Sequence, residues 1–332
     1  MGFIAVKEST CLNYNYKKSG CKYCRDICPQ NCWNESGGIE TSRCDGCGLC
    51  QAACPVDAIG VEGISAADWI ETTRENSAVR HFSCLRNGAG PWACLGFLTA
   101  GDIVAFALAG AENGGCDVVI HNAGCRQCKP AVGAHLEHEI AAAVKFIANV
   151  GGNKIFQGEA AGHIENMPRK IDRRSFFNSL LKSGAQTARN ALWPEEATVP
   201  LPKTGWRIQE LRKIKFAVEE QNIFPILSIA ENCIACGLCA KVCPTKALTE
   251  VSQENALELM HEPCACSGCG LCLEHCPEGA VKFEEAGGNL PYLLIQKPFP
   301  HCNECGAAFQ PAGRQLTCFE CLMKGRRSIF EP

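Results

Sequence analysis

The chain has 332 residues, 46% of them hydrophobic, and a formal net charge of −3 at pH 7. This length is enough for two or three globular domains. The charge lacks the basic excess that is typical of nucleic-acid-binding proteins, so we expect proteins or small molecules as partners and no nucleic acid.

The 27 cysteines set the class of protein, because so many thiols must form disulfides or bind metals. An odd total cannot pair completely. Residues 1–10 lack the basic and apolar segments of a secretory signal, which predicts a reducing, cytoplasmic location where thiolates stay available to metals. The longest apolar stretch, residues 95–111, is interrupted by Asp102, so no membrane-spanning segment is expected.

The first cysteine-rich segment contains two cysteine runs. The second run, residues 44–55, reads C-x2-C-x2-C-x3-C-P, in which the first three thiolates bind one [4Fe–4S] cluster and the fourth binds its neighbour. The first run has the same spacing when it is read backwards from Pro29, except that residues 12–20 are inserted after its first cysteine. The runs therefore predict two clusters. One has the ligands Cys11, Cys21, Cys24 and Cys54, and the other has Cys28, Cys44, Cys47 and Cys50.

Two alternatives stay open for this segment. Cys32 is an alternative to Cys11 as the ligand that completes the first cluster, and otherwise is a small buried hydrophobic residue. Zinc knuckles are an alternative for all of these cysteines, but the spacing suits a cubane cluster better than a tetrahedral ion. The prediction is a dicluster module over residues 1–65.

The middle of the chain has the alternating pattern of predicted strands and helices that is typical of an α/β domain. Strands are expected at residues 79–84, 117–121 and 154–157, and helices at residues 102–111 and 129–148. This alternation predicts a small parallel sheet over residues 75–165, with its site at the carboxyl ends of the strands. Two loops at that edge supply the candidate ligands Cys84, Cys94, Cys125 and Cys128.

Four thiols at that edge can hold a [2Fe–2S] cluster, a [4Fe–4S] cluster or zinc, and we favour a cluster. The alternative is thiols that only pack, or an exchangeable pair of Cys125 and Cys128. His135 and His138 lie one helical turn apart, where a solvent-exposed face is more usual than a metal site. His121 follows a strand beside the proposed site and is a candidate to contact a metal ligand.

Residues 166–225 are predicted to form a helical linker, with an amphipathic helix at residues 169–193 and a second helix at about residues 206–220. Residues 226–288 then repeat the regular cysteine pattern twice, which is typical of a duplicated structural unit. The spacing predicts a second dicluster module. One cluster has the ligands Cys233, Cys236, Cys239 and Cys276, and the other has Cys243, Cys266, Cys269 and Cys272.

The last segment, residues 289–332, carries two C-x2-C pairs separated by 12 residues. Two such pairs facing each other form a closed tetrahedral site, so we expect a zinc-ribbon-like tail. Its ligands are Cys302, Cys305, Cys318 and Cys321. A single iron or a [4Fe–4S] cluster is the alternative occupant. Cys116 and Cys264 are left as non-ligands.

Two resemblances add to these inferences. Residues 1–62 and 226–285 resemble bacterial dicluster ferredoxins in repeats such as CDGCGLCQAACPVDAIGVE and CIACGLCAKVCPTKALTEV. This implies two ferredoxin folds, each with a pair of β-hairpins and two short helices, that move electrons without substrate chemistry. Residues 92–128 resemble the small iron–sulfur (delta) subunit of methyl-viologen-reducing hydrogenase in Cys94-x-Gly96 and in the closing C-x2-C pair. That likeness implies a [2Fe–2S] centre that passes electrons to a partner enzyme.

The predicted fold class is therefore multidomain, with α+β ferredoxin-like modules and a parallel α/β domain. We expect a polyferredoxin-like subunit that relays single low-potential electrons in an oxidoreductase complex of anaerobic metabolism, with no catalytic residue of its own. Flavin, hydrogenase or molybdenum and tungsten subunits are the candidate partners, because no nucleotide-binding glycine fingerprint is present. The alternatives are a ferredoxin-fed thiol/disulfide reductase that ends at Cys125 and Cys128, and a redox or iron sensor.

Overall fold

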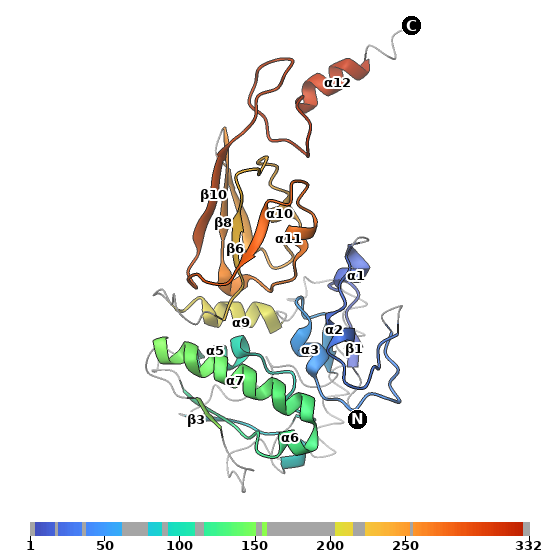
Figure 1. The fold of residues 1–332 in the computed structure, drawn as a ribbon, viewed down its shortest axis with the longest axis vertical. Coiled ribbons are helices and arrows are strands. Elements are labelled where there is room, and N and C mark those ends of the chain that lie inside the picture. Colours follow the sequence, from blue (N-terminus) through green and yellow to red (C-terminus); the bar gives the residue numbers. More distant parts are fainter. Residues whose placement is uncertain are drawn as a thin grey trace, which may run out of the picture.

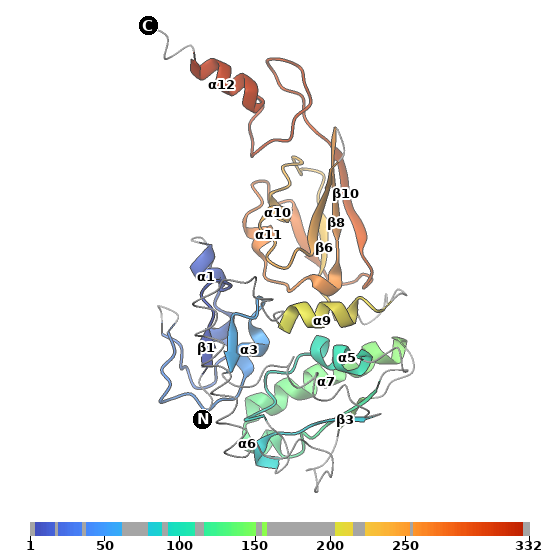
Figure 2. The same cartoon turned by 180° about the vertical axis from the view of Figure 1, so that it is seen from behind.

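The computed structural model describes residues 4–16, 19–34, 38–61, 79–87, 92–109, 116–150, 155–157, 203–214, 223–252 and 255–327. Helix α9 (Lys203–Leu211) lies between the middle region, with helix α5 (Ala100–Leu108), and the sheet of the C-terminal half (Figures 1 and 2). Helix α12 (Phe319–Arg327) is at the far end of the molecule from α5. None of the helices in the described part of the chain is long and apolar enough to cross a membrane.

The two ends of the first cysteine-rich segment are strands that pair with each other. Strand β1 (Ile4–Val6) pairs in antiparallel fashion with β2 (Ile59–Val61), so the start and finish of the segment lie side by side. Between them are three short helices: α1 (Leu12–Asn15), α2 (Tyr23–Asp26) and α3 (Leu49–Ala53). Helix α1 lies within the insertion that widens the first cysteine run, and α2 and α3 each carry a cysteine.

The middle region contains the parallel sheet expected from the alternation of strands and helices. Its strand order is β3 (Val79–Phe82), β4 (Asp117–Ile120), β5 (Ile155–Gln157). Helix α7 (Pro130–Val150) packs with α5, and the short η1 (Leu85–Asn87) and α6 (Cys125–Cys128) occupy the loops after β3 and β4. The carboxyl ends of β3 and β4 therefore place both cysteine-bearing loops at one edge of the sheet.

The polar residue in the apolar stretch is explained by helix capping. The Asp102 carboxylate accepts a hydrogen bond from the backbone N–H of Thr99 (3.0 Å), and the backbone N–H of Asp102 donates to the Thr99 hydroxyl (3.3 Å), which forms a capping box at the start of α5. The fully buried Asp102 also pairs with Arg207 of α9 at 3.7 Å. This stretch is consequently a buried nine-residue helix of the domain core.

Helix α9 is shorter than the helix predicted at residues 206–220, because it ends at Leu211. Residues 215–222 and the helix predicted at residues 169–193 lie outside the described residues. The buried side chains of Ile208 and Leu211 anchor α9, and Arg212 forms an ion pair with Glu262 of the C-terminal half. The linker thus binds to the regions on both of its sides.

The second cysteine-rich region contains two antiparallel sheets. Strand β6 (Ile226–Ile229) pairs with β9 (Val281–Glu284), and β8 (Ala256–His261) lies between β7 (Leu248–Ser252) and β10 (Tyr292–Pro298). Helices α10 (Leu238–Lys241) and α11 (Leu271–Glu274) and the short η3 (Pro263–Ala265) complete it. Strand β10 comes from the stretch that the sequence assigned to the tail, but it completes the hydrogen bonding of β8.

One hydrophobic core crosses several of the predicted boundaries. The same buried cluster contains Leu49 of α3, Phe106 of α5, Leu136 of α7, Leu211 of α9 and Cys264. A segment of about 60 residues buries a smaller fraction of its surface than a larger domain and is only marginally stable alone, so sharing a core is physically favourable. The first cysteine-rich segment therefore packs against the middle region instead of standing apart from it.

Candidate metal centres

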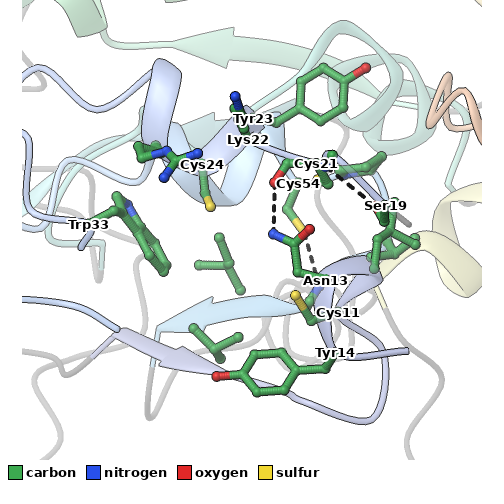
Figure 3. Close-up of a pocket in the computed structure, with 18 of the residues that line it drawn as sticks. Cys11, Asn13, Tyr14, Ser19, Cys21, Lys22, Tyr23, Cys24, Trp33 and Cys54 are labelled. Carbon is green, nitrogen blue, oxygen red and sulfur yellow. Dashed lines mark hydrogen bonds between the residues drawn. The ribbon is translucent and has the colours of Figure 1, made fainter. Parts of the chain in front are cut away.

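The first predicted ligand set lines one cavity of about 260 Å³. The cavity is lined by Cys11, Cys21, Cys24 and Cys54 together with parts of the insertion. Figure 3 shows the sulfurs of Cys11, Cys24 and Cys54 turned toward the same space, with the indole of Trp33 beside it. Asn13 donates from Nδ2 to the carbonyl of Cys21 at 2.7 Å, so the insertion also fixes the backbone at its far end.

The neighbouring ligand set gathers around the buried Cys50. Burial raises the pKa of Cys50, and the charges of Cys47, Cys44 and Cys28 raise it further, which shows that these thiols are close together. Cys32 lies beside this second set, because its backbone N–H donates to Cys28 Sγ at 3.5 Å. It is not among the residues that line the first cavity. The structure therefore places Cys11, and not Cys32, with the first set.

In the second cysteine-rich region, each predicted set lines a cavity of its own. One cavity includes Cys233, Cys236, Cys239 and Cys276. The other includes Cys243, Cys266, Cys269 and Cys272. In each set the last cysteine of one run joins three cysteines of the other run, as the cysteine spacing predicts.

The two cysteine-rich regions share local details that bear on sulfur chemistry. The backbone N–H of Ala58 donates to Cys54 Sγ, and that of Ala280 donates to Cys276 Sγ, both at 3.2 Å. Hydrogen bonds of this kind stabilise negative charge on a cysteine sulfur and tune the reduction potential of a bound cluster. Short helices follow a glycine with left-handed φ at Gly48, Gly237 and Gly270, and the same arrangement precedes α6 at Gly124.

Burial makes most of these thiols weak acids. Burial raises the pKa of Cys24 to about 11, with an added effect from the charges of Cys21 and Cys54. Burial likewise raises the pKa values of Cys239 and Cys272 to about 12. These thiols are protonated at neutral pH unless a cation compensates the thiolate. Metal binding at such sites releases protons and contributes to folding.

The middle site contains the four cysteines that the topology brings to the sheet edge. Cys84, Cys94 and Cys125 pack against the main core, whereas Cys128 is exposed. Burial raises the pKa of Cys125 to about 11, and the charges of Cys84, Cys94 and Cys128 add to it. Arg86 donates from Nη1 to Cys128 Sγ at 2.8 Å. The exposed sulfur of Cys128 therefore has a cationic side chain as its hydrogen-bond donor.

The middle site directly adjoins the first cysteine-rich region. A Cβ added at Gly96 would lie 2.3 Å from the carbonyl oxygen of Cys47, so the two backbones are in contact. Lys129 Nζ donates to the carbonyl of Asp45 at 2.8 Å and pairs with its carboxylate at 3.2 Å. Gly96 follows Cys94 by two positions and Lys129 follows Cys128 directly, so both loops of the middle site hold the cysteine run of the first region.

The tail site is tighter than the others. The sulfurs of Cys302, Cys305, Cys318 and Cys321 all lie within 4.8 Å of one another. Hydrogen bonds from the backbone N–H groups of Cys318 and Cys305 lower the pKa of Cys302 to about 6. Cys305 Sγ and Cys318 Sγ are 3.8 Å apart. Bonds of about 2.3 Å in a tetrahedral zinc–thiolate site place the sulfurs about 3.8 Å apart, so these residues fit one ion.

The wider spacing elsewhere suits larger groups. Within the described part of the chain, the tail is the one place where three or more donor atoms of Cys, His, Asp or Glu lie within 4.8 Å of one another. In a cubane cluster each thiolate binds a different iron, so its sulfurs must stand further apart than around a single ion. The all-cysteine donor sets therefore fit iron–sulfur clusters, and three of these sets each line a cavity.

The histidines make no comparable group. His135 Nε2 lies 2.8 Å from the carbonyl oxygen of Leu98, and His138 is exposed beside Glu139. His121 is buried, and its Nε2 is 3.0 Å from Nδ1 of His81. Among the described residues, no histidine belongs to a metal-binding group.

Sequence reasoning missed several residues that shape these sites. Arg86 contacts a candidate ligand, Lys129 connects two sites, and Tyr16 of the insertion reaches the second cysteine-rich region. A basic residue directly after a C-x2-C pair is a weak signal for Lys129. The contacts of Arg86 and Tyr16 join residues 42 and 226 positions apart, and no sequence motif predicts them.

Comparisons with known proteins agree with this chemistry. Residues 232–280 match the model of a 4Fe-4S dicluster domain, and residues 38–60 match that of a 4Fe-4S binding domain. A ferredoxin of Rickettsia felis is 37% identical over 60 residues, which are 17% of this chain and 55% of that protein. Pyruvate synthase subunit PorD of Methanothermobacter marburgensis is 40% identical over 42 residues, which are 13% of this chain and 52% of that protein.

The chain thus spans about half the length of the curated relatives it matches. The matched segments contain cysteine runs from both cysteine-rich regions, and the structure gathers those cysteines into sets. These findings support the prediction of 4Fe–4S binding and electron transfer. The chain therefore contains two regions that match 4Fe–4S ferredoxin-type families.

Proposed function

We propose that this chain is a multi-cluster electron-transfer subunit that relays single low-potential electrons within a larger oxidoreductase complex. Bound iron–sulfur clusters would supply reversible one-electron chemistry. The chain's own residues would hold the cluster sites next to one another and provide surfaces for a partner. The observation that carries the proposal is the continuity of these sites.

The series begins at the middle site, where Gly96 and Lys129 contact the cysteine run of the first region. The two sets of the first region interlock, because each run contributes a ligand to the other set. Cys21 of the first region and Cys269 of the second then line one cavity. Four [4Fe–4S] clusters with the predicted ligand sets would therefore form an uninterrupted path.

The middle site is proposed to hold a further cluster, [2Fe–2S] or [4Fe–4S], with the ligands Cys84, Cys94, Cys125 and Cys128. The spacing of its sulfurs is wider than that of the tail site. Its α6 loop also begins with the same left-handed glycine that precedes the short helices of the ferredoxin-type regions. The proposed tail occupant is zinc, which would stabilise a segment that has a small buried cluster of its own.

The reductase alternative has less support. A nucleophilic C-x2-C pair needs a thiol with a lowered pKa, whereas burial raises the pKa of Cys125 to about 11. Arg86 donates to Cys128 Sγ, and the sulfur of a metal-bound cysteine can accept the same hydrogen bond. Alkylation of the anaerobic protein followed by mass mapping separates the two functions. Protection of both residues excludes the reductase.

The partner is proposed to be an oxidoreductase subunit with its own source or sink of electrons. One relative is described as a subunit of pyruvate synthase, which supports a role within an oxidoreductase complex. Flavin, hydrogenase and molybdenum or tungsten subunits are the candidate classes. A cytoplasmic location and anaerobic metabolism are part of the same proposal.

The first test is metal analysis of the anaerobically purified chain. Four cubane clusters contribute about sixteen irons, and the middle cluster adds about two or four more. We expect that total, an equal amount of acid-labile sulfide and one zinc per chain. About eight irons or fewer, with several zincs, would overturn the dicluster assignment of at least one region.

A further inference from the structure

The insertion in the first cysteine run reaches the second cysteine-rich region. Tyr16, which ends helix α1, donates from its hydroxyl to the carbonyl of Val242 at 3.3 Å. Its ring also meets the ring of His275 edge-on, with the centroids 5.9 Å apart and an angle of 72° between the planes. Val242 directly precedes Cys243, and His275 directly precedes Cys276. Tyr16 therefore contacts the residue that directly follows each of the two cysteine-bearing helices of the second region, α10 and α11.

The same insertion borders a cavity between the two regions. The cavity has a volume of about 380 Å³ and is lined from the first region by Ser19, Gly20, Cys21, Lys22, Tyr23 and Asp26. From the second region it is lined by Cys269, Gly270 and Glu274. One proposed cluster ligand of each region thus faces the same space.

The two thiols belong to different proposed ligand sets and line the same cavity. Cys21 is a proposed ligand of the cluster in the first cavity, and Cys269 is a proposed ligand in the set with Cys243, Cys266 and Cys272. These two sets are consequently the ones that face each other across the boundary between the regions.

We propose that electrons cross between the two ferredoxin-type regions at Cys21 and Cys269, and that Tyr16 is the positioning residue that holds this crossing together. The inference rests on the proposed function. In each crossing, a cluster bound by the set on one side would be oxidised by one electron, and a cluster bound by the set on the other side would be reduced by one electron. No bond forms or breaks and no proton needs to move. The electron comes from a reduced subunit of the partner complex, or from dithionite in the test.

This assignment gives the insertion a role. A regular run needs two residues between its first and second cysteines, whereas this chain has nine. The added residues provide both the helix that ends at Tyr16 and the loop that lines the cavity. The path then runs from the middle site through the set of Cys47 and the set of Cys21 to the sets of the second region.

The test compares Tyr16→Ala and Tyr16→Phe with the wild-type full chain. Leu293→Ala is the control, because Leu293 is an exposed apolar side chain of β10 and lines neither this cavity nor the first one. Each protein is mixed anaerobically with less than one equivalent of dithionite, and freeze-quench EPR follows how the electron redistributes among the clusters. Rates that do not depend on protein concentration identify transfer within one chain.

We expect Tyr16→Ala to lose the fast phase of redistribution while its iron, sulfide and final EPR spectrum match the wild type. Tyr16→Phe keeps the ring contact with His275 and should recover most of the fast phase, and Leu293→Ala should keep all of it. A second measurement is carbodiimide cross-linking of Lys22 to Glu274, which both line the cavity, with mass mapping. We expect the cross-link in the wild type and its loss in Tyr16→Ala.

An unchanged fast phase in Tyr16→Ala would overturn the crossing, and so would an absent cross-link in the wild type. The failure of the proposed function has a different signature, because the wild-type chain would then lack the expected iron and reducible EPR signals altogether.

Discussion

Gly96 and Cys47 are in backbone contact, and a Cβ on Gly96 would lie 2.3 Å from the carbonyl oxygen of Cys47. Gly96 belongs to the loop that carries Cys94, and Cys47 belongs to the cysteine run of the first region. The contact is reciprocal, because a Cβ on Gly48 would lie 3.0 Å from the backbone nitrogen of Phe97. The middle site and the first region are therefore packed as one unit.

This contact predicts that Gly96→Ala is destabilising. The added methyl group meets backbone atoms, which cannot rotate away as a side chain can, so overpacking should cost about 1–3 kcal/mol. The free energy of unfolding, measured anaerobically by denaturant titration, checks this. Gly60→Ala is the matched control, because a Cβ there meets nothing within 4 Å. Equal stability of the two variants would contradict the packing described here.

The ligand sets predict opposite outcomes for two cysteines of the first region. Cys11→Ser should cost one cluster, about four irons per chain, because Cys11 lines the first cavity with Cys21, Cys24 and Cys54. Cys32→Ser should keep all of the iron, because Cys32 lies outside that cavity. Iron analysis and EPR spin quantification measure both. The reverse result would mean that Cys32 completes the cluster.

The tail site predicts that zinc removal affects the tail alone. Cys302→Ala should abolish zinc binding, since it removes one of four sulfurs that lie within 4.8 Å of one another. Limited proteolysis should then cut the tail more rapidly, because metal binding and folding are coupled at such sites. The zinc and iron contents per chain are measured together by inductively coupled plasma mass spectrometry. Cys264→Ala is the control, because it changes a buried cysteine outside the proposed ligand sets, and it should retain both metals. A loss of iron in Cys302→Ala would count against a separate zinc site.

His261 predicts a loss of stability in acid. Its Nδ1 is 3.0 Å from the Tyr292 hydroxyl oxygen, which itself donates to the carbonyl of Leu227 at 2.6 Å. Nδ1 is therefore the donor, and the buried Nε2 has no hydrogen-bond partner. Burial lowers the pKa of His261 from 6.5 to about 4, so the folded protein keeps this imidazole neutral.

The unfolded chain binds a proton at His261 more readily than the folded protein does. The stability that the neutral His261 contributes is therefore fully present above pH 6.5 and is lost as the pH falls toward 4. The loss reaches about 2 kcal/mol at pH 5. His261→Asn keeps a donor near Nδ1 and removes the titrating group. Denaturant titration at pH 7 and pH 5 should show a smaller acid-dependent loss of stability in the variant than in the wild type, and parallel losses would refute the assignment.

Most of the candidate ligand sets consist of residues that are close together in the sequence, so they could be predicted from the sequence. The ligands of a cubane cluster come from one short run plus one cysteine of its partner run, so spacing alone predicted the sets that share cavities, including the set around Cys239. The strands and helices of the middle region were predicted at nearly the observed positions, because a buried parallel sheet requires apolar runs that alternate with helices. The polar Asp102 within such a run was harder to interpret, since its role as a helix cap depends on Thr99.

The sequence by itself predicted which cysteines lie close together, because those relations depend on spacing within short loops. Only the tertiary structure decided how the sites follow one another. The contacts of Gly96 with Cys47, of Lys129 with Asp45 and of Tyr16 with Val242 join residues 49, 84 and 226 positions apart. Such contacts arise from complementary surfaces and a shared hydrophobic core, which leave no periodic signal along the chain.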